Sequence, residues 1–337
     1  MHSDMIVDER YMWRALELAR HGMGHVSPNP MVGAVIVAPD GSIIGEGYHR
    51  KYGEGHAEVN AVASVRDRRQ LLDATMYVTL EPCSHYGKTP PCAKLIVDCH
   101  IPRVVVGAGD PNEKVSGRGI AMLRDAGVEV VTGVLEEESR RLNAAFITAH
   151  SCHRPFVTLK WAQSADGFMD RDRSNDAPPA AISSPLGRLA VHRLRAVHDA
   201  ILVGSGTVIS DDPVLDSRLW GGRSPRPVIL DRRHRIDDTY KVLGRDPIII
   251  DRHDGVEDIL RQLYSFGITS LLVEGGPSVL GSFIESGLWD VARVETSDKN
   301  FAPHGVARAP FVAAPPVRTY AIDNSIVTVY SNNPLIV

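Results

Sequence analysis

The stretch EPCSHYGKTPPCAK, residues 81–94, decides how the first half of this 337-residue chain is interpreted. It places Cys83 and Cys92 nine positions apart, each directly after a proline. Two such cysteines can form a disulfide, fill apolar space, or bind a metal ion as thiolates. The chain holds four cysteines and shows no secretory signal, which favours a reducing compartment. In that setting, neighbouring cysteines bind metal or do chemistry more often than they form a structural disulfide.

The composition is that of a globular protein and argues against two kinds of partner. Hydrophobic residues make up 43% of the chain and charged residues 23%, which is ordinary for a soluble protein. A net charge of −4 offers no broad basic face for nucleic acid. No apolar run approaches the length of a membrane span, so we expect no membrane partner. We expect a cytoplasmic protein that binds small molecules, and we also expect it to be a homo-oligomer, although composition does not indicate the oligomeric state.

The length of the chain favours two domains, because one hydrophobic core seldom serves more than about 250–300 residues. Strand-like and helix-like segments alternate in both halves, which predicts an α/β fold with helices packed on mostly parallel or mixed sheets. Apolar residues at helical spacing predict a helix over residues 9–22. A helical segment over residues 135–150 is expected to close the first unit. We therefore place the domains at residues 1–150 and 151–337.

A second motif, GEGHAEVNA, lies upstream of the cysteines and contains His56-Ala57-Glu58 at the start of a predicted helix. Zinc-dependent deaminases combine H-x-E with a later pair of cysteines, and their glutamate moves protons without binding the metal. Three protein ligands leave the fourth position of Zn²⁺ for water, as in a catalytic site. The metal lowers the pKa of that water from ~16 to ~7. Glu58 would then carry a proton to a ring nitrogen and to the departing ammonia.

The positions of these residues relative to helices support a metal site. His56 and Glu58 are two residues apart, so they can converge only in the first turn of a helix. Cys92 follows Pro90-Pro91 and is also expected near a helix N-terminus, where the helix dipole favours a thiolate. An isolated HxE motif has little specificity, and one buried cysteine is more often packing than ligand. The conjunction of the three motifs indicates a zinc site, whereas Cys99 and Cys152 have no such setting.

Three stretches of the first half, HAEVNAV, EPCSHYGKTPPC and VVVGAGDPN, resemble the deaminase half of the bifunctional riboflavin-biosynthesis deaminase–reductases. With SPNPMVGAVIV, the resemblance covers most of residues 9–150. It implies a cytidine-deaminase-like three-layer domain with the zinc ligands His56, Cys83 and Cys92 and the proton shuttle Glu58. The long PCxxxGxTPPC spacing separates this family from cytidine and tRNA-adenosine deaminases, which use a short PCxxC.

The same resemblance implies which residues contact the substrate of the deaminase. These are Asn29, His49, Lys88, Asp110 and Asn112. A cation and several amide or carboxylate groups suit a phosphorylated, polar pyrimidine. Without the resemblance, Asn29 would be interpreted as a turn residue between prolines and Lys88 as a solvated loop charge.

The second half resembles the family's reductase domain, which is similar in fold to dihydrofolate reductase, in four stretches: LKWAQSADG, LRAVHDAILVGSGTVISDDPVLDSR, PVILD and LLVEGGPSVL. The implied NADPH contacts are Ala162, Thr207, Asp211, Gly275, Gly276, Pro277 and Ser278. The implied substrate contacts are Arg195, Leu215, Arg218 and Glu274, with Lys160 as a catalytic residue near the reacting ribose.

The chemistry of these residues agrees with that assignment. Arginine forms bidentate pairs with phosphate oxygens, which suits Arg195 and Arg218 as phosphate ligands. Gly275 and Gly276 stand between a strand and a helix, where the backbone can approach a phosphate closely. The chain has no G-x-G-x-x-G motif, so a Rossmann dinucleotide site is not predicted.

One stretch departs from the family pattern. Many members carry an aromatic residue that touches the cofactor before the SSP motif, where this chain has Ala181. The family's serine substrate contact is also missing, with Pro179 nearby. The departure bears on cofactor affinity and on the geometry of residues 171–181, which are predicted as a surface loop.

The resemblance implies two successive reactions in riboflavin biosynthesis. The first is deamination of 2,5-diamino-6-(5-phosphoribosylamino)pyrimidin-4(3H)-one, and the second is NADPH-dependent reduction of the product's ribosyl group to ribityl. One alternative is a deaminase of nucleic acids or free nucleosides with an appended domain, which the acidic balance and the long cysteine spacing oppose. Another is a non-enzymatic zinc module, which requires a fourth protein ligand, and His85 is the only candidate.

Overall fold

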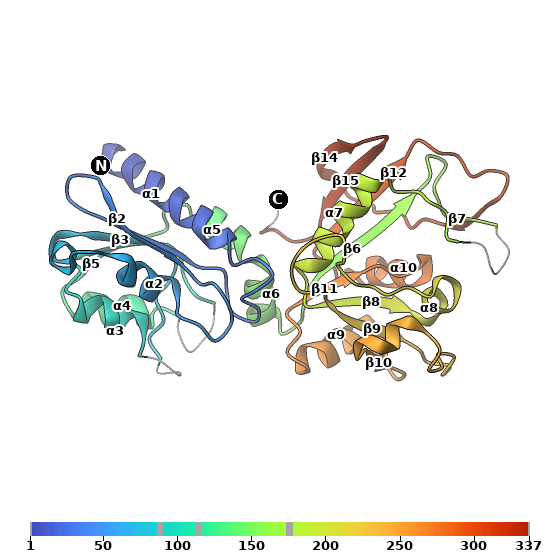
Figure 1. The fold of residues 1–337 in the computed structure, drawn as a ribbon, viewed down its shortest axis with the longest axis horizontal. Coiled ribbons are helices and arrows are strands. Elements are labelled where there is room, and N and C mark those ends of the chain that lie inside the picture. Colours follow the sequence, from blue (N-terminus) through green and yellow to red (C-terminus); the bar gives the residue numbers. More distant parts are fainter. Residues whose placement is uncertain (1, 86–89, 112–115, 173–177, 336–337) are drawn as a thin grey trace. The chain divides into compact units, whose positions relative to one another are not determined.

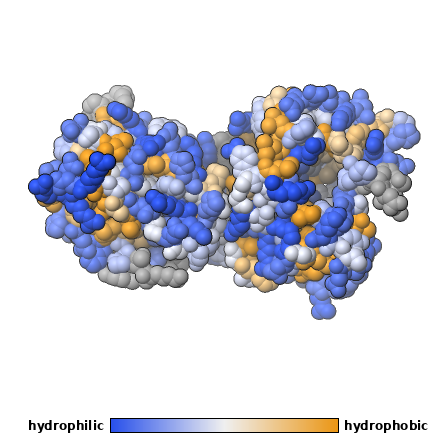
Figure 2. Space-filling model, in the orientation of Figure 1, coloured by the Kyte–Doolittle hydropathy of each residue, from blue (hydrophilic) through white to orange (hydrophobic). Residues whose placement is uncertain are grey.

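The computed structural model describes residues 2–85, 90–111, 116–172 and 178–335. The chain divides into two compact units, Met1–Cys152 and His153–Val337, each with hydrophobic clusters of its own. Figure 2 shows apolar side chains in small groups among hydrophilic ones on the visible face of each unit. Among the described residues, no helix combines the length and apolar character needed to cross a bilayer.

The first unit is built on a five-stranded sheet in the order β2-β1-β3-β4-β5. Its strands are β1 (Gly33–Val37), β2 (Ile43–Tyr48), β3 (Thr75–Leu80), β4 (Arg103–Ala108) and β5 (Glu129–Thr132). Its helices are α1 (His2–Arg20), α2 (Ala57–Ser64), the 3₁₀ helix η1 (Arg68–Asp73), α3 (Cys92–Asp98), α4 (Arg118–Asp125), α5 (Glu136–Leu142) and α6 (Ala144–Cys152). Strand β1 is antiparallel to both neighbours, whereas β3, β4 and β5 are parallel.

Both faces of this sheet are covered, because successive side chains of its strands point to opposite faces. Ala34 and Ile36 pack with α2, α3 and α4, whereas Val35 and Val37 pack with α1. Figure 1 shows α1 and α5 on one side of the sheet and α2, α3 and α4 on the other. The predicted three-layer arrangement of helices around a mixed sheet is therefore confirmed.

The helix predicted over residues 135–150 is two helices. Helix α5 ends at Leu142 and α6 begins at Ala144, with Asn143 between them. The buried amide of Asn143 donates to the Met31 carbonyl (2.9 Å) and accepts from the Met31 amide (2.8 Å). The break therefore lets one side chain hold the loop before β1, which carries Asn29.

The second unit is built on an eight-stranded sheet in the order β10-β9-β8-β11-β6-β12-β15-β14. Its strands are β6 (Phe156–Gln163), β8 (Ala200–Gly204), β9 (Arg226–Leu230), β10 (Ile248–Ile250), β11 (Ser270–Val273), β12 (Val291–Ser297), β14 (Pro316–Ile322) and β15 (Ser325–Ser331), and β7 (Phe168–Arg171) pairs with β13 (Gly305–Arg308) in a separate ribbon. Its helices are α7 (Pro185–Ala196), α8 (Ser205–Asp211), the 3₁₀ helix η2 (Lys241–Arg245), α9 (Val256–Ser265) and α10 (Pro277–Ser286).

Six neighbouring strands of this sheet, from β10 to β12, are parallel, and β15 and β14 follow in antiparallel pairing. Helices α9 and α10 pack on one face through residues such as Leu263 and Phe283. Val208 of α8 and Leu215 pack on the other face. The predicted α/β class is confirmed here too, and the parallel strands bring their carboxyl ends to one edge.

Candidate active sites

His56, Cys83 and Cys92 converge in the first unit, and their ligand atoms all lie within 4.8 Å of one another. The Nδ1 atom of His56 is 3.6 Å from the Cys83 sulfur and 3.4 Å from the Cys92 sulfur. All four cysteines of the chain are free, which excludes a disulfide between Cys83 and Cys92. The predicted metal ligands are therefore brought together.

The spacing of these three atoms matches a tetrahedral zinc ion. With Zn–S bonds of about 2.3 Å and Zn–N bonds of about 2.05 Å, tetrahedral angles place sulfur and nitrogen about 3.6 Å apart. The two observed separations, 3.4 and 3.6 Å, agree with that value. One histidine and two thiolates are also a soft donor set that suits zinc. The residues present therefore fit the metal.

Local backbone structure explains why the ligands meet. His56 is the N-cap of α2, and Glu58 is in the first turn, as the HxE spacing predicts. Cys92 is the first residue of α3 and follows the N-cap Pro91, where a thiolate is favoured. The backbone N–H of Cys92 also donates to the Cys83 sulfur at 3.3 Å. Two helix N-termini thus converge on the metal position.

The electrostatics of the site distinguish its acids and bases. A hydrogen bond from Cys92 and the adjacent His56 lower the pKa of the Cys83 thiol to about 4. Hydrogen bonding to Cys83 raises the pKa of His56. Glu58 is only 3% exposed, and burial raises its pKa. A raised pKa favours uptake of a proton by the carboxyl group, which suits a proton shuttle.

A cavity of about 470 Å³ opens on this metal position. Asn29, His49 and Asp110, three of the predicted substrate contacts, line it together with His56 and Glu58. The predicted contacts Lys88 and Asn112 lie outside the described residues. The cavity is thus lined by every predicted substrate contact of the deaminase that the structure describes.

His49 and Asn29 have fixed orientations in this cavity. The Nδ1 atom of His49 is 3.1 Å from the Gly55 carbonyl, so it is the donor, and Nε2 is then free to accept from the Asn29 amide at 3.1 Å. Burial lowers the pKa of His49, which favours this neutral form. The hydrogen bond uses the NH₂ group of Asn29, so its carbonyl oxygen remains an acceptor for a ligand.

Sequence reasoning missed two residues that position this site. The buried carboxylate of Glu81 accepts from the backbone N–H groups of Gly117 (3.0 Å) and Gly119 (2.9 Å), which ties the segment after Asp110 to the strand that precedes Cys83. Asn143 holds the loop that carries Asn29. Glu81 belongs to the quoted EPC motif, but no local pattern reveals partners more than thirty positions away.

The candidate fourth ligand His85 also lines the cavity. Among the described residues, however, the metal-binding group consists of His56, Cys83 and Cys92 alone. Three ligands and an adjoining cavity are the arrangement of a catalytic zinc site, whereas a structural site has four closed positions.

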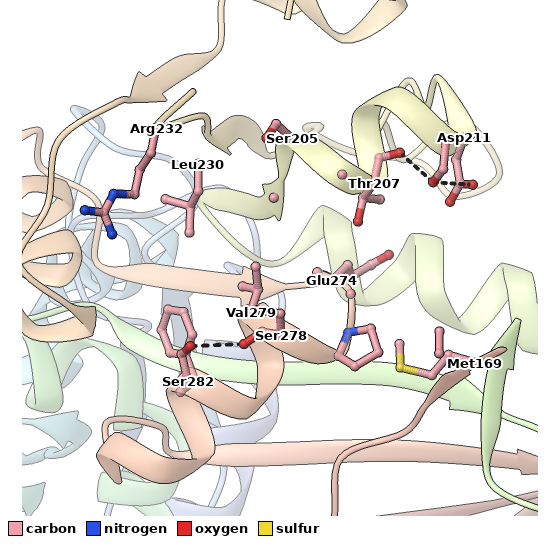
Figure 3. Close-up of a pocket in the computed structure, with 18 of the residues that line it drawn as sticks. Met169, Ser205, Thr207, Asp211, Leu230, Arg232, Glu274, Ser278, Val279 and Ser282 are labelled. Atoms are coloured by element: carbon pink, nitrogen blue, oxygen red, sulfur yellow. Dashed lines mark hydrogen bonds between the residues drawn. The ribbon is translucent and has the colours of Figure 1, made fainter. Parts of the chain in front are cut away.

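The second unit contains a cavity of about 670 Å³ at the carboxyl ends of its parallel strands. Open α/β sheets bind ligands at this edge. Predicted cofactor contacts line it after β8 and after β11, namely Thr207, Asp211, Gly275, Gly276, Pro277 and Ser278. In Figure 3, Thr207 on α8 and Ser278 on α10 lie on opposite sides of the cavity.

Arginines that the sequence analysis overlooked line the same cavity after β9. They are Arg232, Arg233 and Arg235, and the guanidinium of Arg235 donates to the Ser205 hydroxyl (2.8 Å). Figure 3 shows Arg232 at the opposite end of the cavity from Met169. The run DRRHR directly after the strand PVIL could have indicated a phosphate-binding end.

A neighbouring cavity of about 420 Å³ contains Lys160 and Ala162. It shares Met169, Glu274 and Gly275 with the larger cavity, so the two spaces adjoin. Lys160 and the predicted cofactor contacts therefore line adjoining cavities, and Glu274 lies where the two cavities meet.

Arg195 and Glu274, both predicted substrate contacts, form a largely buried ion pair with N–O distances of 2.7 and 3.1 Å. Burial alone would raise the pKa of Glu274, but the charges of Arg195 and Lys160 outweigh it and lower that pKa to about 2. Glu274 is therefore an anion at neutral pH.

The remaining two predicted substrate contacts of the reductase, Leu215 and Arg218, do not lie beside Glu274 in the cavities. Leu215 is buried in the apolar cluster beside Ile201, and its carbonyl accepts from Arg245 at 2.7 Å. Arg218 is exposed and pairs with Asp216. Neither of them is among the residues that line the two cavities described above.

The segment that departs from the family pattern borders the smaller cavity. Pro179 and Ala181 both line it, and the Lys299 ammonium donates to the Ala181 carbonyl. Part of the predicted loop 171–181 lies outside the described residues. The backbone of Ala181 is thus held by a specific contact even though its side chain is small.

Both units match known family profiles. Residues 5–108 match the cytidine and deoxycytidylate deaminase zinc-binding region, and residues 155–296 match the RibD C-terminal domain. A zinc-binding deaminase domain followed by this reductase domain defines a bifunctional enzyme.

Full-length relatives and solved structures narrow this class. The chain is 40% identical to the riboflavin biosynthesis protein RibD of Aquifex aeolicus and 41% identical to that of Bacillus amyloliquefaciens, over 84% of this chain and 85% and 82% of theirs. The Thermotoga maritima diaminohydroxyphosphoribosylaminopyrimidine deaminase/5-amino-6-(5-phosphoribosylamino)uracil reductase superposes with a TM-score of 0.87 at 39% identity, covering 97% of this chain and 99% of that one. Acinetobacter baumannii RibD gives a TM-score of 0.86 at 32% identity, covering 96% and 98%. The chain belongs to the RibD family of riboflavin biosynthesis proteins, which confirms the resemblance, the fold classes and the bifunctional assignment.

Proposed function

We propose that residues 1–150 deaminate 2,5-diamino-6-(5-phosphoribosylamino)pyrimidin-4(3H)-one and that residues 151–337 reduce the ribosyl group of the product to ribityl with NADPH. The observation that carries the proposal is the three-ligand group His56, Cys83 and Cys92 beside buried Glu58 in an open cavity. The name of the Thermotoga relative contains both activities.

In the deaminase, Zn²⁺ held by His56, Cys83 and Cys92 would supply Lewis-acid activation of the attacking water. Glu58 takes one proton of that water and passes it to a ring nitrogen. It then carries the remaining hydroxyl proton of the substrate adduct to the amino group, which leaves as ammonia as the ring carbonyl forms. The carbonyl oxygen of Asn29, oriented by His49, accepts an N–H of the substrate ring. Asp110, which lines the same cavity, would accept a second one. Binding through acceptors selects an amino-substituted pyrimidine.

In the reductase, bound NADPH would supply the hydride. As the ribosyl C1′–O4′ bond breaks and hydride is added at C1′, O4′ takes up one proton, which Lys160, a residue of the smaller cavity, would donate. The overall step consumes one hydride and one proton and yields the open ribityl chain. Arg195 and Arg218 are proposed to bind the substrate phosphate, with Leu215 and Glu274 as further substrate contacts.

The shape of the larger cavity supports NADPH as the cofactor. Its junction with the Lys160 cavity is where hydride transfer would take place, and Gly275-Gly276 at the start of α10 suit the pyrophosphate. Arg232 at the far end would then face the 2′-phosphate that distinguishes NADPH from NADH, and Arg233 follows it in the chain and lines the same cavity. Ala162, Thr207, Asp211, Pro277 and Ser278 complete the proposed contacts.

The deaminase half is tested by Glu58→Gln. The variant should retain stoichiometric zinc but release ammonia from the diaminopyrimidine substrate about 10²–10⁴-fold more slowly, since general acid–base catalysis contributes about that factor. Unchanged ammonia release, or wild-type protein without zinc, would refute the mechanism. Ammonia release from cytidine or tRNA would instead favour the nucleoside or nucleic-acid alternative.

A cytoplasmic homo-oligomer belongs to the same proposal. Light scattering on the purified full chain tests the oligomeric state, and a monomer mass would contradict it.

A further inference from the structure

Five charged side chains lie together beneath α7 in the second unit, and we call them the buried charge cluster. They are Lys160 on β6, Arg195 on α7, Glu274 after β11, and Arg293 and Glu295 on β12. Arg293 and Glu295 are 7% and 0% exposed, and neither was singled out by its sequence context. Two charges on a central strand need an explanation, because burying ions is costly.

Strand register places this pair beside Lys160. In the parallel pairing of β6 and β12, Arg293 is opposite Lys160, and Glu295 is opposite Ala162, a residue of the Lys160 cavity. Paired residues project from the same face of a sheet, so all four side chains are on one face. Neighbouring Ala292 and Val294 point into the core on the other face. The two charges are thus directed toward the reductase site.

Positively charged groups lie next to the Glu295 carboxylate. Its Oε2 atom is 3.9 Å from the Arg293 guanidinium. Its Oε1 atom lies against Gly187 in the first turn of α7, so close that a Cβ there would be only 2.8 Å away. The positive end of a helix dipole stabilises a carboxylate at this position. A side chain at position 187 would therefore collide with the Glu295 carboxylate, and glycine leaves room for it.

Neither oxygen of Glu295 has a hydrogen-bond partner among the described residues. An unpartnered buried anion can act on a neighbouring cation at short range. Glu274, the other anion of the cluster, already accepts two hydrogen bonds from Arg195. Lys160 makes no hydrogen bond or ion pair within the described residues, so its charge depends on the field of its neighbours.

We infer that Glu295 is a positioning residue of the reductase: placed between Arg293 and the start of α7, its carboxylate keeps the Lys160 amine protonated beside the site of hydride transfer. This inference rests on the proposed role of Lys160 as proton donor. Glu274 alone does not suffice, because Arg195 neutralises it. Glu295 supplies the second negative charge of the cluster.

The charges around Lys160 give the direction of the effect. Burial lowers the pKa of Lys160, and the charges of Glu274 and Glu295 act against it, whereas Arg195 and Arg293 act with it. Arg188 of α7 borders the same cavity. Removing the charge of Glu295 therefore favours the neutral amine, and the proton donor is lost at a lower pH.

The test is the pH dependence of NADPH oxidation by the full chain, with the deaminated substrate supplied directly. Glu295→Gln should move the alkaline limb of kcat/KM to lower pH by on the order of one pH unit, as expected when one nearby charge is removed at an effective dielectric constant of about 20. Glu257→Gln, on the exposed face of α9, is the matched control and should leave the profile unchanged. Lys160→Arg should move the alkaline limb out of the measured pH range, and this result would show that the limb reports the titration of Lys160.

Two further arms separate this role from a structural one. Glu295→Asp keeps the charge and should restore the wild-type limb. If Glu295→Gln does not fold, Glu295→Met, which buries no unpartnered amide, must show the same shift. An unmoved limb in a folded, charge-free variant overturns the inference. If wild-type protein does not oxidise NADPH at all, the proposed reductase function itself fails.

Discussion

Replacing Arg195 by Met should destabilise the second unit by about 3–5 kcal/mol at neutral pH, since it leaves a buried carboxylate without its partner. The structure gives an independent magnitude. The pKa of Glu274 falls from its ordinary value of 4.5 to about 2 in the folded protein. A difference of about 2.5 in pKa, to which both Arg195 and Lys160 contribute, corresponds to about 3 kcal/mol, the same order as the first figure. Methionine keeps most of the volume, so packing changes little.

The pH dependence of this effect has a definite sign. Folding lowers the pKa of Glu274, so the pair contributes its full stability above about pH 4.5, and the contribution is lost as the pH falls toward 2. The Arg195→Met penalty should therefore be largest at neutral pH and shrink in acid, where Glu274 can take up a proton.

Calorimetry on the full chain is the appropriate assay, because two units can unfold in separate transitions. The transition of the second unit should fall by on the order of 10 °C, since about 2–4 °C per kcal/mol is typical for a unit of this size. Arg195→Met/Glu274→Gln should recover most of the loss, because neither member of this pair is then left charged without its partner. An unchanged transition in Arg195→Met, or a double variant as unstable as the single one, would refute this reasoning.

Three further predictions concern the two sites. Asn143→Ala removes both hydrogen bonds to Met31 and should lower kcat/KM for ammonia release at least tenfold with zinc content unchanged; parallel zinc analysis and steady-state kinetics check this. Arg232→Ala should raise KM for NADPH roughly tenfold and leave KM for NADH unchanged, and equal changes for both would contradict a 2′-phosphate contact. Chelation of zinc should abolish ammonia release while the reductase still accepts deaminated substrate, and parallel loss of both activities would argue against separate sites.

The sequence allowed prediction of the metal site because helix starts constrain it locally. HAE and PPC each place a ligand in a first turn, and the structure has His56 as the N-cap of α2 and Cys92 as the first residue of α3. The α/β layers were also predictable, since alternating apolar residues such as those of β1 bury both faces of a sheet.

Residues that act across long sequence separations could not be predicted. The contact from Asn143 to Met31 spans 112 positions, and its local sequence indicates only a helix. Arg293 and Glu295 were missed for a different reason: charges in a strand are normally taken to face solvent, and only the register with β6 shows that they face Lys160.

The most direct test of the two-site account follows ammonia release and NADPH oxidation together in Cys92→Ala, which removes one metal ligand from the first unit. With the diaminopyrimidine substrate, the variant should release no ammonia and oxidise no NADPH. With the deaminated substrate, it should oxidise NADPH at the wild-type rate. Ammonia release by this variant, or failure to reduce the deaminated substrate by a folded protein, would contradict the assignment of one activity to each unit.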